Sequence, residues 1–300
     1  MTVIESPVRE LTGLPAPAKL NLFLHITGLR DDGYHLLQSV FMLVDWQDTI
    51  DLTLREDGRL SREDSGNRLT LPDNDLCVRA AHALRQATGC TLGAHIRLHK
   101  QIPAEAGMGG GSSDAATCLI GLNRLWGLGL TRAELARIGL GLGADVPFFI
   151  GGHNAWVEGV GEQLTPVRLP RRRFAIVKPP TGASTPKIFA SPSLKRDTKT
   201  ATMQGFAADE TSEAMLDMEK IFSHTRNDLQ PVAQGLCPDI ERCIDWLSGQ
   251  GLQSRMTGSG SAVFALLPDA FDALAPFPEG WVARICRNLD VHPLTGWISG

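Results

Sequence analysis

The stretch of sequence that decides the fold is Gly107-Met108-Gly109-Gly110-Gly111-Ser112-Ser113-Asp114-Ala115-Ala116. It follows an alternating segment at residues 95–99, which predicts a strand, and precedes apolar residues at helical spacing over 115–126. Glycines allow a tight turn whose backbone N–H groups point inward, and the positive end of the following helix adds to their effect. The pattern predicts a phosphate-binding loop. In it, Ser112 or Ser113 is expected to cap the helix and still to offer a hydroxyl group to a phosphate or to its magnesium ion.

Other glycine-rich motifs do not fit this stretch. It contains no Gly-Lys-[Ser/Thr], so it is not a Walker A loop. The dinucleotide pattern Gly-x-Gly-x-x-Gly fails at Ser112, and the nucleophile elbow Gly-x-Ser-x-Gly fails at Ala115. The protein-kinase signatures His-Arg-Asp and Asp-Phe-Gly are absent. Taken alone, the stretch could also be a flexible turn rich in glycine and serine.

Upstream of this loop, residues 18–26 (AKLNLFLHI) alternate in the manner of a strand. One face of this strand is aliphatic, whereas the other carries Lys19 and Asn21 together with Phe23 and His25. A charge and an amide on one face predict that this face meets something polar. The dipeptide Asp32-Gly33 then marks a tight turn.

The rest of the chain mixes strands and helices without strict alternation, which predicts an α+β protein in two lobes. A stretch rich in proline and arginine at 166–173 marks the boundary, so that the expected lobes are 1–167 and 168–300. Residues 191–212 lack apolar periodicity and are expected to be mobile. The predicted strands are 36–44, 49–54, 174–177, 262–267 and 281–286, with a hairpin over 157–164. The predicted helices are 75–88, one capped by Thr131 and Glu134, 213–222, 239–248 and a short one between the last two strands.

Composition narrows the class of protein. A hydrophobic content of 43% supports a packed core, and the net charge of −4 with a pI near 6.1 argues against a nucleic-acid partner. The six cysteines form no Cys-x-x-Cys pair, so we expect free thiols in a reducing compartment. The sequence contains no secretory signal pattern and no uncharged apolar run long enough to span a membrane. We therefore expect a cytoplasmic protein without a membrane partner, as a monomer or weak homodimer.

Two further segments form a recognisable set of motifs together with the glycine loop. Pro17-Ala18-Lys19-Leu20-Asn21-Leu22 lies near the start, and Met256-Thr257-Gly258-Ser259-Gly260-Ser261-Ala262 lies near the end. Together the three segments resemble the motifs of the GHMP kinases, and the resemblance covers nearly the whole chain in the correct order. It implies a two-lobe fold with a ribosomal-S5-like N-terminal lobe and a ferredoxin-like C-terminal lobe.

Within the family, the chain looks most like the branch that phosphorylates a cytidine diphosphate ester of methylerythritol in isoprenoid precursor synthesis. The marks of this branch are Asp32-Gly33-Tyr34-His35, Leu142-Gly143-Ala144-Asp145-Val146-Pro147-Phe148-Phe149 and Arg226-Asn227-Asp228-Leu229. The resemblance implies that ATP, with Mg²⁺, phosphorylates the 2-hydroxyl group of the ester, and that Asp145 is the catalytic base beside Lys19.

The resemblance also assigns binding roles. Residues 107–113, namely Gly107, Met108, Gly109, Gly110, Gly111, Ser112 and Ser113, would wrap the ATP phosphates, with Asn74 and Lys100 at the adenine pocket. Tyr34, His35 and Phe189 would hold the cytosine, with Asn21 also near the substrate. The metal ligands stay unassigned. Taken singly, Asp145 would more often be a helix cap, Lys19 a solvated lysine at a strand edge, and Tyr34 a turn residue.

Alternatives remain open at this point. The protein could be a GHMP kinase for mevalonate, homoserine or a sugar, although these substrates offer no pyrimidine to Tyr34, His35 and Phe189. It could be a non-catalytic nucleotide sensor of the same fold. The presence of both Lys19 and Asp145 argues against this alternative. An RNA-binding protein with an S5-like fold conflicts with the acidic pI. Two positions depart from the family pattern, Glu105 where a small residue is common and Met108 where leucine is frequent.

Overall fold

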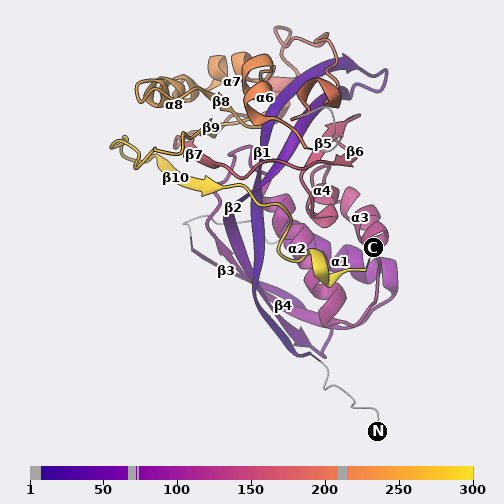
Figure 1. Cartoon of the computed structure of the whole chain (residues 1–300). Helices are drawn as coiled ribbons and strands as arrows, with labels where there is room; N and C mark the ends of the chain where they lie inside the picture. The colour runs from indigo at the N-terminus through magenta and orange to yellow at the C-terminus, as the bar shows by residue number, and fades with distance from the viewer. Residues whose placement is uncertain (1–7, 67–71, 73, 209–214, 300) are drawn as a thin grey trace.

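The structure is a computed structural model of the 300-residue chain, and it describes residues 8–66, 72, 74–208 and 215–299. Two β-sheets organise these residues, and helices pack beside each sheet (Figure 1). One sheet has the order β3-β4-β2-β5-β6 with β1 paired to β2, and the other has the order β10-β7-β9-β8. The strands of the first are β1 (Glu10–Leu29), β2 (His35–Arg55), β3 (Leu60–Gly66), β4 (Gly93–Lys100), β5 (Ala155–Glu158) and β6 (Gln163–Pro166). Those of the second are β7 (Arg173–Lys178), β8 (Ser254–Met256), β9 (Val263–Leu266) and β10 (Val282–Arg287).

The helices follow the same division. Those of the first half are α1 (Leu76–Thr88), α2 (Gly110–Leu125), α3 (Arg132–Leu140) and α4 (Val146–Gly151). Those of the second half are α5 (Thr185–Phe189), α6 (Met218–His224), α7 (Gln230–Leu236) and α8 (Asp239–Ser248), with short 3₁₀ turns at Met203–Phe206 and Thr295–Trp297. The predicted starts of α1 and α3 are confirmed: Asp75 accepts a hydrogen bond from Val78 N, and Thr131 forms a capping box with Glu134.

Strand β1 contributes residues to all three hydrophobic clusters that the described residues form. Leu14 belongs to the cluster that includes residues of α1 to α4, Leu20 to a central cluster, and Ile26 to the cluster that includes residues of the second sheet. Both faces of the strand are buried between Ala16 and Ile26, including the face that carries Lys19 and Asn21. Burial of an ammonium and an amide is costly unless both are paired, so these side chains must find partners within the protein.

The prediction of separate strands at 36–44 and 49–54 is wrong, because β2 is one strand of 21 residues. Its pairing with β1 shifts register between Pro17↔Gln47 and Ala18↔Val44, which leaves Asp45 and Trp46 outside the register. A bulge of this kind breaks the alternation that sequence analysis relies on, while the strand itself continues.

Two predictions for the second half also need correction. The short helix expected between the last two strands is absent from the described residues 268–281, where Pro268, Pro276 and Pro278 oppose helical hydrogen bonding. The described part of the segment expected to be mobile, 191–208, packs against the protein through the buried side chains of Leu194 and Phe206. Isolated apolar residues such as these produce no periodic pattern, so sequence analysis does not detect their burial. The predicted helix near 213–222 begins outside the described residues, and α6 covers its later part.

The end of the chain returns to the first lobe, beside α1 and α3 in Figure 1. His292 donates its backbone N–H to Gly152 O at 2.8 Å, and the Arg132 guanidinium donates to Thr295 O at 2.8 Å. Leu294 belongs to the same cluster as the helices of that lobe. The division at 167/168 stays a prediction, but residues 288–299 pack with the first half of the chain.

All six cysteines are free, as predicted, and five of them are buried. No helix in the described part of the chain is long and apolar enough to cross a membrane.

Candidate active site

The glycine-rich segment forms the predicted loop between β4 and α2. Gly107 and Gly109 have φ of +69° and +70°, in the left-handed region that favours glycine. Helix α2 begins at Gly110, and no side chain caps it, so neither Ser112 nor Ser113 has the predicted capping role. The N–H groups of its first turn lack intrahelical partners and stay available to an anion, and the 16-residue helix adds its positive end.

A second loop lies directly behind the first. A Cβ atom on Gly107 would stand 2.3 Å from Thr257 O, and one on Gly258 would stand 2.7 Å from Gly107 O. Ser261 also donates its N–H to Glu105 O at 3.0 Å. The two glycine-containing segments thus pack backbone against backbone, which explains why both motifs need glycine and gives the loop at 107–113 a rigid support.

A cavity of about 850 Å³ opens over the glycine loop, within the range of ordinary ligand sites. Asn74, Lys100, Glu105 and Ser112 all line it. Ser113 is different: its hydroxyl is fully buried and donates to Pro17 O at 2.7 Å. Of the two serines, Ser112 is therefore the one placed to meet a phosphate. Met108 is buried in the central cluster and supports the loop from below.

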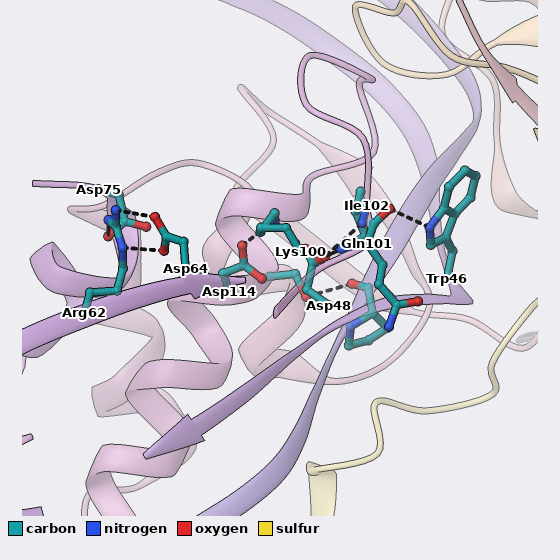
Figure 2. A network of polar contacts seen from close by, with 11 residues as sticks. Trp46, Asp48, Arg62, Asp64, Asp75, Lys100, Gln101, Ile102 and Asp114 are labelled. Carbon is teal, nitrogen blue, oxygen red and sulfur yellow. Dashed lines mark hydrogen bonds and ion pairs between the residues drawn. The ribbon is translucent and has the colours of Figure 1, made fainter. Parts of the chain in front are cut away.

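Lys100 lies under the loop, but its ammonium group is engaged with Asp48 and Asp114 (Figure 2). The distance from Lys100 Nζ to Asp114 Oδ2 is 2.7 Å, and Asp48 also accepts the backbone N–H of Ile102 at 2.8 Å. Burial by itself would lower the pKa of Lys100, but the two carboxylates outweigh it and raise that pKa. Burial raises the pKa of Asp114 well above its usual value, a shift that Lys100 opposes and Asp48 reinforces. Lys100 thus ties the start of α2 to β2 and β4.

A second cavity, of about 390 Å³, adjoins the first. Lys19, Asn21, Asp145 and Phe189 line it, and they come from β1, the residue before α4, and the end of α5. The two cavities have five lining residues in common, namely Gly107, Gly109, Ser112, Thr185 and Ser259. A group bound in one cavity can therefore reach a group bound in the other across the glycine loop.

Lys19 and Asp145 meet in this second cavity, with Lys19 Nζ at 3.4 Å from Asp145 Oδ2. The ammonium also donates to Asn21 Oδ1 at 2.5 Å and lies 4.5 Å from the centre of the Phe41 ring. Asp145 occupies the N-cap position of α4, yet its side chain makes no capping hydrogen bond. The carboxylate is 30% exposed and lines the second cavity, so a ligand bound there can reach it.

Asn21 is held by the protein on three sides. Besides accepting from Lys19, it donates its backbone N–H to Thr257 Oγ1 at 2.9 Å and its side-chain amide to Ser39 Oγ at 3.0 Å. Asn21 lines the second cavity, and its hydrogen bonds orient Lys19 and join β1 to the Gly258 loop.

The three predicted base-binding residues lie near the turn before β2 and at the end of α5. The rings of His35 and Phe189 are in contact, with centroids 5.0 Å apart and planes at 51°. Tyr34 is not part of this contact, and 63% of it is exposed. The structure therefore brings His35 and Phe189 together and leaves the Tyr34 ring open to solvent.

Asp228 lies just before a helix, where an aspartate commonly acts as the cap, but the structure gives it another partner. Helix α7 begins only at Gln230, and Asp228 Oδ2 instead accepts the backbone N–H of Ile26 at 2.8 Å. Its neighbour Asn227 donates to Met256 O and Gly258 O, both at 2.8 Å. This pair links the second half of the chain to β1 and to the loop around Gly258. In the sequence, the only indication of this role was that both residues belong to the motif at 226–229.

Sequence analysis assigned no role to Arg196, Asp48 or Thr185, and it quoted Ser259 only within the motif at 256–262. Arg196 lies in the segment expected to be mobile, and Asp48 and Thr185 carry no local pattern. Their importance follows from contacts between residues far apart in the sequence: Thr185 and Ser259, for example, bond through their hydroxyl groups at 2.6 Å.

A cavity over a glycine loop, beside the buried Lys19 and the partly exposed Asp145, is the arrangement expected of a small-molecule kinase. Family models agree: residues 75–153 match the GHMP kinases N terminal domain and residues 209–275 match the GHMP kinases C terminal domain. Together with relatives that are more than half identical over nearly the whole chain, these matches show that the chain belongs to the GHMP kinase family. The predicted two-lobe α+β fold of that family is confirmed.

The individual relatives point to one member of the family. The 4-diphosphocytidyl-2-C-methyl-D-erythritol kinase of Polaromonas sp. strain JS666 is 58% identical over 97% of this chain and 95% of its own. The enzyme of the same name from Paracidovorax citrulli is 59% identical over 97% of this chain and 99% of its own. The crystal structure of a 4-(cytidine 5'-diphospho)-2C-methyl-D-erythritol kinase matches with a TM-score of 0.71 at 28% identity, over 93% of this chain and 98% of that one.

Proposed function

We propose that this protein transfers the γ-phosphate of ATP to the 2-hydroxyl group of 4-diphosphocytidyl-2-C-methyl-D-erythritol, in the non-mevalonate route to isoprenoid precursors. The names of the relatives support this substrate. The observation that carries the activity is the shared wall of the two cavities: Ser112 lines both, with the Lys19–Asp145 pair on the acceptor side.

The geometry supports a direct transfer. The hydroxyl oxygen attacks the γ-phosphorus, the bond from that phosphorus to the β,γ-bridging oxygen breaks, and ADP leaves. Asp145 accepts the hydroxyl proton, and a base of this kind contributes about 10²–10⁴-fold to rate. Lys19, oriented by Asn21 and Phe41, is placed to donate to the acceptor oxygen or to the transferred phosphoryl group. The loop N–H groups hold the remaining phosphates.

Magnesium fits the donor set of this site. The described residues contain no cluster of three or more His, Cys, Asp or Glu side chains that could hold a metal ion. Mg²⁺ needs no such cluster, because it is usually bound by one or two protein oxygens and by substrate phosphates. The Ser112 hydroxyl and the Glu105 carboxylate line the nucleotide cavity and would hold it. The ion would neutralise charge on the phosphates during transfer.

The cytosine of the substrate would lie against Phe189 and His35. Phe189 lines the acceptor cavity that also holds Asp145, so a base at Phe189 places the rest of the substrate toward the catalytic pair. Tyr34, exposed beside His35, would cover the base from the other side when the substrate binds. Free thiols throughout the chain agree with a cytoplasmic protein, and we propose a monomer or weak homodimer.

One assay tests this function against its alternatives. The protein is incubated with ATP, Mg²⁺ and, separately, the cytidyl ester, mevalonate, homoserine or a sugar, and ADP release is measured. We expect turnover with the cytidyl ester alone. Turnover with another alcohol would assign a different substrate, and tight ATP binding without turnover on any of them would indicate a sensor.

A further inference from the structure

One side chain joins the predicted base-binding residues to the segment at 189–196. Arg196 donates from Nε to His35 Nε2 at 2.9 Å. Its two terminal nitrogens donate to three carbonyl oxygens, those of Leu194 at 3.0 Å, Phe189 at 3.0 Å and Ser191 at 2.9 Å. Arg196 is therefore hydrogen-bonded to both residues of the ring contact, to the imidazole of His35 and to the backbone carbonyl of Phe189.

The bond to His35 determines which imidazole nitrogen carries the proton. A guanidinium group has only donors and stays charged at any pH at which the protein is folded. It can bond to His35 Nε2 only if that nitrogen offers a lone pair, so the proton of the neutral ring lies on Nδ1. Burial lowers the pKa of His35, and the charge of Arg196 lowers it further, so the ring stays neutral. Among the described residues, none is hydrogen-bonded to Nδ1.

A donor on Nδ1 is the feature that distinguishes the two common pyrimidines. Cytosine presents an acceptor at N3, whereas uracil presents an N–H donor there. The Nδ1–H group can bond to the first and opposes the second. The other tautomer, with the proton on Nε2, would reverse this preference.

We propose that Arg196 is the residue that makes the site select cytosine over uracil, because it holds His35 as the tautomer protonated on Nδ1. This proposal rests on the proposed function, which puts a cytosine at His35 and Phe189. Arg196 is a positioning residue: it acts through His35. The substrate class follows from it, since a site with this donor takes a cytidine diphosphate derivative and rejects the uridine equivalent.

Competition binding of CDP and UDP to the whole protein tests the proposal, with three variants. Arg196→Met removes every donor, and Arg196→Lys keeps a cation that can still donate to His35 but loses the fork to the loop carbonyls. Leu194→Ala is the matched control, because it loosens the same loop through a buried apolar side chain that cannot hydrogen-bond to His35. We expect the parent to bind CDP more tightly than UDP. The ratio of the two affinities should fall at least about tenfold in Arg196→Met and should fall less in Arg196→Lys. Leu194→Ala should weaken CDP and UDP equally.

Nitrogen NMR of histidine-labelled protein supplies the second readout, since it distinguishes a protonated ring nitrogen from one with a lone pair. We expect Nδ1 of His35 to be protonated in the parent and the two tautomers to mix in Arg196→Met. If the parent binds CDP and UDP equally, the cytosine site fails and the proposed substrate with it. If the parent prefers CDP but Arg196→Met keeps the full preference, or if the parent carries its proton on Nε2, Arg196 has no such role and the cytosine site stands.

Discussion

Asp145 stands at the N-cap of α4 without capping it, and its carboxylate lies 3.4 Å from Lys19 Nζ instead. An aspartate at this position commonly accepts a backbone N–H of the first turn, which stabilises a helix by about 1 kcal/mol. Here that contribution is absent, and the side chain faces the acceptor cavity. Residues that lack a local structural role and gather around a cavity are the ones expected to act on a ligand.

Asp145→Asn should lower kcat by about 10²–10⁴-fold, because the amide cannot take the proton of the acceptor hydroxyl. Lys19→Met should lower kcat by a similar order, and the double variant should be little worse than either single one, since the two groups act as a unit. Steady-state kinetics give these values, with ATP binding measured separately to show that the nucleotide site is intact. Near-normal turnover of Asp145→Asn would remove it as the base.

Gly111→Val should test the phosphate-binding loop without harming the fold. A Cβ atom there meets only Leu76 Cδ1, at 3.4 Å, and Gly111 lines the nucleotide cavity. ATP affinity should fall at least about tenfold while the melting temperature is kept. Gly110 is a poorer choice, because a Cβ atom there would stand 3.1 Å from Ile102 Cγ2 and would disturb the packing. Gly235→Ala, in open space within α7, is the control; unchanged ATP affinity of Gly111→Val would contradict the loop assignment.

Glu105→Gln should raise the Mg²⁺ concentration that gives half-maximal rate. Loss of one charge near a cation costs about 1 kcal/mol at 4 Å in water, which corresponds to about fivefold. A magnesium titration at saturating ATP measures it, with Glu279→Gln as a control at an exposed carboxylate outside the cavity. The same magnesium requirement in both variants would show that Glu105 does not hold the ion.

Tyr34→Ala and Phe189→Ala should each weaken binding of the cytidyl substrate about 5- to 150-fold, since stacking on a base contributes roughly 1–3 kcal/mol per ring. Because Tyr34 is 63% exposed, its removal should leave the melting temperature unchanged, and ATP affinity should be kept in both variants. Calorimetry with CDP and with ATP checks this. A Tyr34→Ala variant that binds CDP like the parent would leave the base held by His35 and Phe189 alone.

His292 should make the protein less stable in mild acid. Burial and the nearby Arg132 lower its pKa to about 4, whereas the unfolded chain takes up the proton near 6.5. Lowering the pH through this window therefore favours the unfolded chain, and at pH 5 the loss is about 2 kcal/mol relative to pH 7. Urea unfolding at both pH values measures it.

His292→Asn is the matched variant for this measurement. The imidazole accepts the N–H of Leu294 at 3.1 Å, and an asparagine oxygen can do the same. The variant should lose about 2 kcal/mol less than the parent between pH 7 and pH 5. An equal loss in both proteins would place the acid sensitivity elsewhere.

The sequence by itself determined the elements that depend on neighbouring residues. The glycine loop needed left-handed backbone at Gly107 and Gly109, and the caps of α1 and α3 needed particular side chains at particular positions, so local pattern was sufficient. The three motifs together also indicated the family, and the structure brings Lys19, Asp145 and the loop to one place.

The tertiary structure alone decided what distant side chains do. Ser113 turned to Pro17 and Lys100 to Asp48 and Asp114, because a buried polar group must find a partner wherever the fold supplies one. Asp228 bonds to β1 for the same reason, although its own neighbourhood resembled a cap. Arg196 lies in a segment without periodicity, and its contact with His35 joins residues 161 positions apart. No local pattern encodes such a contact, since only the folded chain brings the two together.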